Sequence, residues 1–252
     1  PLAWVWLRNR GAGDVGRLRA LTLLTLFLTF DLVLFGAFTR LTDSGLGCPD
    51  WPGCYGKFTP HHAAEHINEA YVAAPQGPVS MAKAWKEMVH RYLAGSLGVL
   101  IIVIAGLAWR QRGRLGQSPW LATALVGVVI LQGLFGKWTV TMLLKPAIVT
   151  GHLIGGLVTL ALLTWLSMRQ SEWRPPRAVS AGLRTAALVG FVLLAGQILL
   201  GGWVSTNYAG LACTDLPTCQ GRWLPDMDFG HGFHLVRELG QTADGATLPL
   251  PA

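Results

Sequence analysis

The sequence predicts an all-α polytopic membrane protein, a bundle of membrane-spanning helices, and three observations support this class. Hydrophobic residues make up 52% of the 252 residues and charged residues only 13%, whereas about a quarter of a soluble domain is charged. Several apolar runs approach the length of about 20 residues that a helix needs to cross a bilayer. Most of the arginines lie in short segments that flank these runs.

Five apolar runs are expected to span the membrane. The first follows a basic N-terminal segment, the second follows a long polar loop, and a short loop joins the third to the fourth. As helices, these runs would be about as long as the hydrocarbon core is thick. The runs are Ala20–Phe38, Tyr92–Trp109, Leu121–Phe135 with an extension to Val140, Ala147–Met168 and Thr185–Val204.

The distribution of charge predicts the orientation of the bundle. Eleven basic residues flank the spans on one side, against the acids Asp14 and Glu172, while the other side has nine basic and ten acidic residues. Short arginine-rich loops stay in the cytoplasm. We therefore expect a bacterial inner-membrane protein with a cytoplasmic N-terminus and with 40–91, 137–146 and 205–252 in the periplasm. The net charge of +7 reflects this topology, and no nucleic-acid partner is expected.

The four cysteines lie in two of the outward loops. Five residues separate Cys48 from Cys54, and five separate Cys213 from Cys219. The bacterial periplasm is oxidising, so two disulfides are expected. A zinc site fits poorly, because the spacing is not finger-like and no histidine is adjacent. A disulfide that also exchanges electrons is left open.

Residues 36–60 and 201–225 are two copies of one motif. At a constant offset of 165, nine of their 25 positions are identical, including both cysteines, and each copy follows a span that exits outward. Internal repeats of this kind are common in membrane folds. We therefore expect two related halves. Residues 1–178 would form a four-helix half with the outer loop 40–91, and residues 179–252 would begin the second half.

The repeat also predicts more spans than the sequence contains. The first half has four spans, so a matching second half would bring the total to eight, of which five are present. The position that matches Glu87 is 252, the last residue. We therefore expect the sequence to stop before a sixth span of a longer protein.

Two histidines lie near the outward ends of spans. His90 is at the start of the second span and His152 is about two turns into the fourth, so both are expected within roughly 10 Å of the outer boundary. Two histidines on neighbouring helices at one level can bind a heme iron from both sides. Gly151, Gly155 and Gly156 would leave space for the flat macrocycle. The alternative is that each histidine only hydrogen-bonds a neighbouring helix.

Charged residues beside these histidines extend the candidate site. Glu87 precedes His90 by about one helical turn, so the two side chains can share a face. A carboxylate beside a heme could accept a proton or stabilise positive charge. Arg91, with Lys137 and Lys145, could meet heme propionates. The alternatives are an ion pair between Glu87 and a nearby cation, and ordinary snorkelling of the basic side chains.

Asp31 is the one ionisable residue expected near the middle of a span. Polar groups at that depth are costly unless they find a partner. We expect the Asp31 carboxyl group to hydrogen-bond Gln132 or Gln197 on another helix, with a proton path as the less favoured alternative.

Three motifs resemble those of the heme A synthase family. They are TRLTDSGLGCPDWPGC at 39–54, the Glu-x-x-His-Arg formed by Glu87, His90 and Arg91, and the later His152. The resemblance covers essentially the whole chain. It implies an eight-helix membrane enzyme, built from two pseudo-symmetric four-helix halves, that oxidises the C8 methyl group of heme O to the formyl group of heme A for terminal cytochrome oxidase.

The resemblance also implies roles for individual residues. His90 and His152 would be the axial iron ligands of the substrate heme O, Arg91 would contact it, and Glu87 would assist the chemistry. A heme B cofactor would lie between histidines of the sixth and eighth spans, which the sequence does not contain. The expected partners are heme O and membrane lipid, with heme O synthase, oxidase assembly factors and a second copy of the chain as further candidates.

By the same resemblance, a Cys48–Cys54 disulfide lies above the site as a brace, and its redox participation is left open. Two other functions are kept beside this one. A membrane thiol–disulfide oxidoreductase would use the cysteine pairs as its chemistry, although neither pair has the usual Cys-x-x-Cys spacing. A non-catalytic bis-histidine heme carrier would use the histidines alone.

Overall fold

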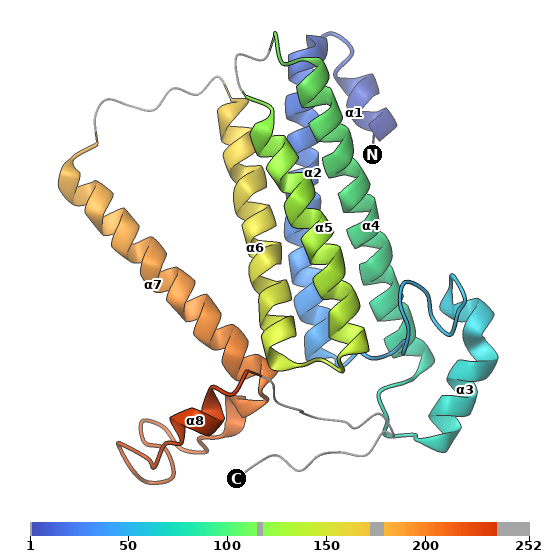
Figure 1. The fold of residues 1–252 in the computed structure, drawn as a ribbon, viewed down its shortest axis with the longest axis vertical. Coiled ribbons are helices and arrows are strands. Elements are labelled where there is room, and N and C mark those ends of the chain that lie inside the picture. The colour runs from blue at the N-terminus through green and yellow to red at the C-terminus, as the bar shows by residue number, and fades with distance from the viewer. Residues whose placement is uncertain (1, 115–117, 172–178, 236–252) are drawn as a thin grey trace.

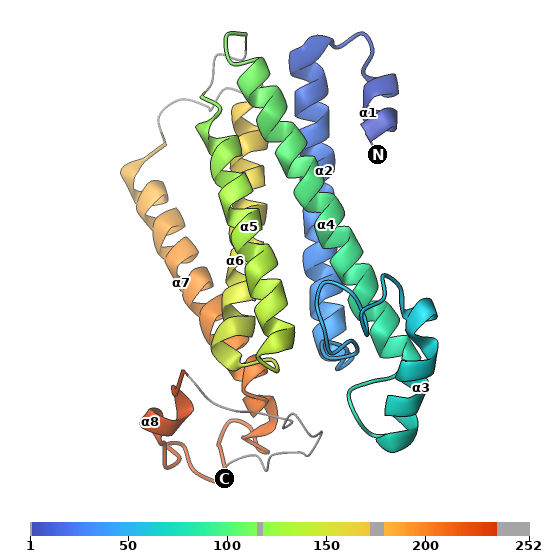
Figure 2. The same ribbon diagram turned by 45° about the vertical axis from the view of Figure 1, so that its right-hand side comes forward.

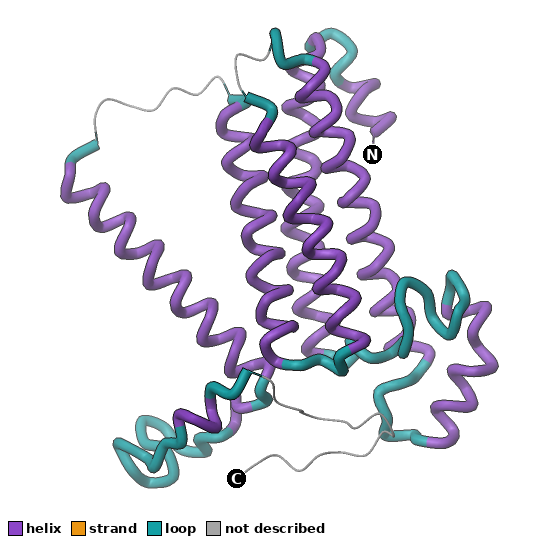
Figure 3. The backbone as a smooth tube through the Cα atoms, in the orientation of Figure 1, coloured by secondary structure: helices purple, strands orange, loops and turns teal. Residues whose placement is uncertain are grey.

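The structure, a computed structural model, describes residues 2–114, 118–171 and 179–235, and this part of the chain is helical without any strand (Figure 3). Five helices are long and apolar enough to cross a membrane, which confirms the predicted fold class and number of spans. Each extends beyond the apolar run that predicted it. They are α2 (Gly13–Leu41), α4 (Met81–Arg110), α5 (Trp120–Thr141), α6 (Pro146–Arg169) and α7 (Ala181–Thr206).

Short helices lie at the ends of the long ones. The N-terminal α1 (Leu2–Arg8) packs on α2, and the pair η1 (Pro60–Ala63) and α3 (Ala64–Ala73) packs against α4 in the first outer loop (Figure 1). The second outer loop carries η2 (Ala209–Leu211) and α8 (Phe229–Gly232).

Serine caps define the N-terminal ends of α4 and α7, outside the apolar runs that predicted these helices. The Ser80 hydroxyl accepts a hydrogen bond from the Lys83 amide (3.3 Å) and caps α4. The Ser180 hydroxyl caps α7 in the same way, as expected for serine at this position. Since α4 begins at Met81, its first turns place Glu87 and His90 on a helix.

Helices α2, α4, α5 and α6 form a four-helix bundle in which neighbours are antiparallel (Figures 1 and 2). Both α2 and α5 contact α4 and α6, whereas no contact joins α4 to α6 within the described part of the chain. The helices therefore stand around a square, with α4 and α6 diagonally opposite and running in the same direction. Helix α7 contacts α6 at the end of the bundle that carries the first outer loop. Toward the other end, α7 leans away from α6 (Figure 1).

We call the end of the bundle with Arg17 and Arg110 the arginine end, and the end with the disulfide loops the loop end. The main buried core fills the arginine end, and a smaller cluster lies under the first outer loop. Neither cluster includes a residue of 33–47 or 132–156. The main core is Leu18, Leu21, Leu97, Leu100, Ile101, Ile104, Ala105, Ala108, Ala122, Leu125, Leu163 and Leu166, and the smaller one is Cys48, Cys54, Ala63, Ile67, Ala84 and Met88.

The two copies of the repeated motif share the same backbone features. Helices α2 and α7 end at matching positions, each cysteine pair forms a disulfide, and each loop closes with one isolated bridge. An aspartate in each loop accepts hydrogen bonds from two backbone amides that follow the second cysteine. These features recur at the offset of 165, with disulfides Cys48–Cys54 and Cys213–Cys219, bridges Cys54–Lys57 and Cys219–Arg222, and aspartates Asp50 and Asp215.

The two copies also meet at matching positions. Arg40, at the end of α2, donates a hydrogen bond to the carbonyl oxygen of Ser205 at the end of α7 (2.9 Å), and these residues are 165 apart. Its other guanidinium nitrogen donates to the Tyr208 hydroxyl (2.8 Å). The predicted boundary between halves at residue 178 lies outside the described residues, so the division into halves stays a prediction.

Candidate functional site

His90 and His152 lie at the same end of the bundle, on the diagonal helices α4 and α6. The Nδ1 atoms of both imidazoles are buried. The sequence predicted matching depth but placed them on neighbouring helices. Helices α2 and α5 lie between α4 and α6 instead, so the two imidazoles come from opposite corners of the bundle.

Each imidazole lies against a glycine of an adjacent helix. A Cβ atom on Gly36 of α2 would be 3.1 Å from Cε1 of His90, and one on Gly136 of α5 would be 3.5 Å from Cε1 of His152. Phe35 stacks on His90 with ring centroids 6.2 Å apart and an angle of 16° between the planes. Sequence reasoning missed these glycines, although a glycine inside a helical pattern often marks such a close approach.

Three polar atoms near the loop end have no partner. Nδ1 of His90, Nδ1 of His152 and Oε1 of Gln132 are buried, and no described residue gives them a hydrogen bond. Gln132 lies beside His152, because its Nε2 donates to the His152 carbonyl oxygen (2.9 Å). Buried polar atoms are nearly always paired. Their occurrence together, at the level where the apolar core is interrupted, fits a site that receives a ligand.

The glycines near His152 have a different role from the one predicted. A Cβ on Gly151 would be 2.8 Å from the Phe135 ring, and a Cβ on Gly155 would be 2.8 Å from the Gln132 side chain. These glycines let α5 approach α6 closely, as small residues do between membrane helices. The prediction that they, with Gly156, leave space for a macrocycle is therefore wrong.

Asp31 is not part of the site. It lies on the exposed surface of α2 and has no hydrogen bond within the described part of the chain, and Gln132 bonds the α6 backbone instead. The buried face of α2 carries Thr25 and Thr29. Asp31 follows Thr29 by two residues, so its side chain points to the opposite side of α2. The predicted bond from Asp31 to Gln132 is therefore wrong.

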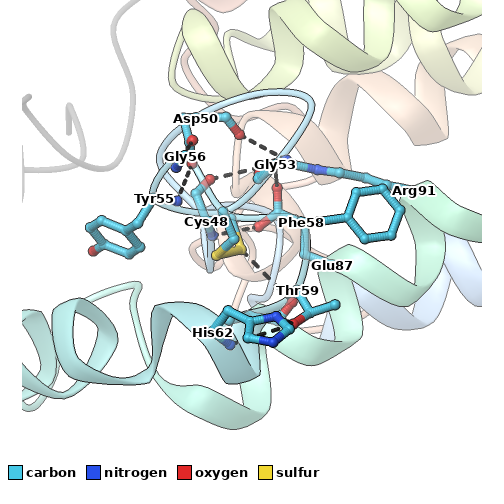
Figure 4. The surroundings of a disulfide bond; sticks show 12 residues. Cys48, Asp50, Gly53, Tyr55, Gly56, Phe58, Thr59, His62, Glu87 and Arg91 are labelled. Atoms are coloured by element: carbon cyan, nitrogen blue, oxygen red, sulfur yellow. Dashed lines mark hydrogen bonds and ion pairs between the residues drawn. A yellow bond between two sulfur atoms is a disulfide. The ribbon is translucent and has the colours of Figure 1, made fainter.

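Glu87 and Arg91 fasten the first disulfide loop to α4 (Figure 4). Glu87 is only 4% exposed. Its Oε2 accepts a hydrogen bond from the Cys48 amide (2.8 Å), and its Oε1 forms an ion pair with Arg91. One guanidinium nitrogen of Arg91 also donates to the carbonyl oxygens of Asp50 (2.7 Å) and Gly53 (2.6 Å). The ion pair that the sequence left as an alternative is therefore formed.

The loop packs tightly onto the helix that carries His90. The two cysteines of the loop, Cys48 and Cys54, are 0% exposed. A Cβ on Gly47 would be only 2.5 Å from the carbonyl carbon of Lys83, so this close approach to the α4 backbone requires glycine. The loop is thus held by a buried ion pair, by backbone contacts and by the disulfide. That Arg91 also meets a heme propionate stays a prediction.

Comparison with known proteins supports the family predicted from the motifs. The family model described as cytochrome oxidase assembly protein, COX15-CtaA, matches residues 19–242. The chain belongs to this family. Both histidines, Glu87, Arg91 and all four cysteines lie inside the segment that matches the COX15-CtaA family.

Curated relatives carry the name heme A synthase. The one from Shewanella oneidensis is 42% identical over 215 residues, which are 83% of this chain and 63% of that protein. Those from Halalkalibacterium halodurans and Mesorhizobium japonicum are 29% and 32% identical, over 84% and 86% of this chain and 67% and 64% of their own lengths. The chain therefore spans about two thirds of the length of these COX15-CtaA relatives, and only 63% of the first.

Proposed function

We propose that this chain binds heme O between His90 and His152 and acts in the oxidation of its C8 methyl group, as part of a heme A synthase. The observation that carries the proposal is the pair of imidazoles whose Nδ1 atoms are buried without a partner among the described residues, on diagonal helices of one bundle. Facing helices of a bundle are a common place for heme and metal ligands. The name of the curated relatives supports the identity of the substrate.

In this proposal His90 and His152 hold the substrate by its iron. Iron in a porphyrin supplies two axial coordination positions and redox chemistry. The protein's contribution is placement: two ligands from helices that run in the same direction fix the porphyrin, and with it the methyl group that is oxidised. Gly36 and Gly136 support this placement, since each lets an imidazole lie against the neighbouring backbone.

Glu87 is proposed to assist the oxidation by accepting a proton or stabilising positive charge. It lies about one helical turn from His90, and both of its oxygens have partners that fix their direction. In this proposal Arg91 acts as a positioning residue, because it pairs with Glu87 and holds the loop at the same time. The enzyme would be an oxidoreductase.

The proposed setting is the bacterial inner membrane, with the loop end in the periplasm. The eleven basic residues on the arginine side support this orientation. A heme B cofactor, contacts with heme O synthase or oxidase assembly factors, and self-association belong to the proposal by family resemblance. The thiol–disulfide oxidoreductase alternative is not favoured, since Cys48 and Cys54 are fully buried and neither this pair nor Cys213–Cys219 has the usual Cys-x-x-Cys spacing.

A visible spectrum and a product assay test the proposal together. The protein is produced with heme O, and His90→Ala and His152→Ala are compared with His62→Ala, which changes an outer-loop histidine bonded to Thr59. Both site variants should lose the Soret band of the bound substrate, while His62→Ala keeps it. A Soret band that survives in both site variants contradicts the proposed ligands.

The same assay separates an enzyme from a heme carrier. Glu87→Gln should retain heme O but form little or no heme A. Full heme A production by Glu87→Gln would remove the proposed role of this carboxylate. Heme binding without any oxidation by the unchanged protein would support the carrier instead.

A further inference from the structure

A polar cavity lies at the arginine end, between α2 and α4. Its volume is about 210 Å³, and it is lined by Asp14, Arg110, Gln111 and Arg114. That volume corresponds to about seven water molecules at about 30 Å³ each. It is smaller than the pockets of about 300–1,000 Å³ that bind drug-sized ligands, and it suits a compact headgroup.

In and beside this cavity, guanidinium groups outnumber carboxylate groups, so positive charge is in excess. Asp14 is shared by Arg114 (3.3 Å) and Arg17 (3.7 Å). Arg110 is exposed and forms no ion pair or hydrogen bond with any residue in the described ranges. The lining of the cavity thus has two arginines and one aspartate, so the cavity favours an anion. Guanidinium groups bind phosphate well, because their paired N–H donors match its oxygens.

Gln111 requires that a ligand in this cavity also carry a hydrogen-bond donor. It follows α4 directly, is 9% exposed, and its Oε1 is buried without a partner among the described residues. The neighbouring guanidinium groups form no hydrogen bond with this oxygen, and a buried amide oxygen without a donor is costly. A phosphate alone offers acceptors, whereas a phosphate that carries a hydroxyl group satisfies both the arginines and Gln111.

The surroundings place the cavity at the depth of lipid headgroups. Trp109 and Trp120 lie at this end of α4 and α5 with ring centroids 5.4 Å apart, and Trp120 is 65% exposed. Tryptophans gather at membrane interfaces, and basic pockets between membrane helices bind anionic headgroups. We propose that this cavity binds the headgroup of phosphatidylglycerol, with its phosphate at Arg110 and Arg114 and a glycerol hydroxyl at Gln111.

Native mass spectrometry of the purified protein in mixed micelles tests this site. The probes are phosphatidylglycerol and phosphatidylcholine, the test variant is Arg110→Gln with Arg114→Gln, and the matched control is Arg169→Gln with Arg184→Gln. The control removes the same charge from the same end of the molecule, outside the cavity. We expect the unchanged protein and the control to retain phosphatidylglycerol preferentially, and the test variant to retain roughly tenfold less. Equal loss in both double variants, or no preference over phosphatidylcholine, overturns the site.

Two further arms test the chemistry. Gln111→Leu keeps the charge, so it should reduce the preference for phosphatidylglycerol over phosphatidic acid, which has no headgroup hydroxyl. An unchanged preference in Gln111→Leu overturns the role of Gln111. Inorganic phosphate at the same concentration should not raise the thermal unfolding temperature as phosphatidylglycerol does, and an equal rise would assign the cavity to a free anion instead of a lipid.

Discussion

Gly36 of α2 lies so close to His90 of α4 that a Cβ atom at position 36 would be 3.1 Å from the imidazole Cε1. This is tighter than about nine in ten contacts of real Cβ atoms. The direction of the His90 ring therefore depends on the absence of a side chain on the neighbouring helix. His152 has a similar but looser relationship with Gly136, at 3.5 Å.

This difference leads to the first prediction. Gly36→Ala should displace the His90 ring by a few tenths of an ångström and weaken heme O binding roughly tenfold, since sites tolerate little misplacement of their ligands. Gly136→Ala makes an ordinary contact and should bind normally. The measurement is the Soret absorbance per protein in a heme O titration. Thermal unfolding is the control, because alanine in a helix is worth about 0.5–1 kcal/mol over glycine at both positions. Equal binding by the two variants would contradict the close contact.

The second prediction concerns the buried ion pair. Arg91→Gln leaves the Glu87 carboxylate buried without its cation, which should destabilise the protein by about 3–5 kcal/mol. Adding Glu87→Gln to Arg91→Gln should recover part of this loss. Lys83→Gln breaks the exposed pair with Asp43 and should cost at most about 1 kcal/mol. Denaturant unfolding measures all four proteins, and similar losses for Arg91→Gln and Lys83→Gln would argue against a special role for the buried pair.

The third prediction follows from the enclosure of the first disulfide. Cys48 and Cys54 are 0% exposed, so a dithiol reagent should reduce this disulfide only when the loop opens. Reduction followed by alkylation and peptide mass analysis should show slow modification of both residues. Arg91→Gln should accelerate it, because the loop loses its fastening to α4. Replacing both cysteines by serine should cost roughly 2 kcal/mol of stability. Unchanged reduction rates in Arg91→Gln would show that the arginine does not hold the loop closed.

The fourth prediction tests the close packing of α5 on α6. Gly155→Ala would bring a methyl group to 2.8 Å from the end of the Gln132 side chain. Moving that end breaks its hydrogen bond to the His152 carbonyl oxygen, which should cost about 1 kcal/mol. Gly127→Ala, on the α5 helix, meets nothing within 4 Å and should be neutral or slightly stabilising. Thermal unfolding in detergent compares them. Equal stability of the two variants would mean that the helices separate freely at this level.

The fifth prediction is a pH dependence in the second disulfide loop. The Thr218 hydroxyl and the amides of Gly221 and Gln220 donate hydrogen bonds to Asp215 and hold the pKa of its carboxyl group below the ordinary value. A lowered folded-state pKa means that the stabilisation is complete above the unfolded-state pKa and disappears as the pH falls through the folded-state value. Exchange of the two amide hydrogens, corrected for intrinsic rates, should therefore accelerate in acid. In Asp215→Asn, the acid-induced change should vanish.

The spans were predictable because membrane insertion leaves a strong signal in composition. About 20 apolar residues in succession and arginines on one side suffice to find them. The helix ends were less predictable, since the serine caps lie outside the apolar runs. Thus α4 begins at Met81, where the run suggested Tyr92.

The site was predictable in its residues and less so in its arrangement. His90 and His152 stand out as polar residues in apolar surroundings, and Glu87 and Arg91 have the spacing of a helical ion pair. A single sequence does not say which helices are diagonal in a bundle. It therefore did not show that Gly36 and Gly136 would adjoin the histidines, or that Gly155 would pack against Gln132.

The same limit explains the error at Asp31. Its partner was chosen by depth alone, but the rotation of α2 about its axis is set by Thr25, Thr29 and the apolar core at the arginine end. That rotation turns Asp31 away from α5. Packing between helices, which decides such details, leaves little trace in one sequence.

The hydrogen bond from Arg40 to Ser205 joins a position to its own duplicate. Within two identical copies related by a two-fold axis, such a self-contact occurs only at the axis. The two copies of the motif are parts of one polypeptide, so the two positions can carry different residues, and here one is arginine and the other serine. The single guanidinium of Arg40 thus links the two copies of the motif at a point where two arginines would repel each other.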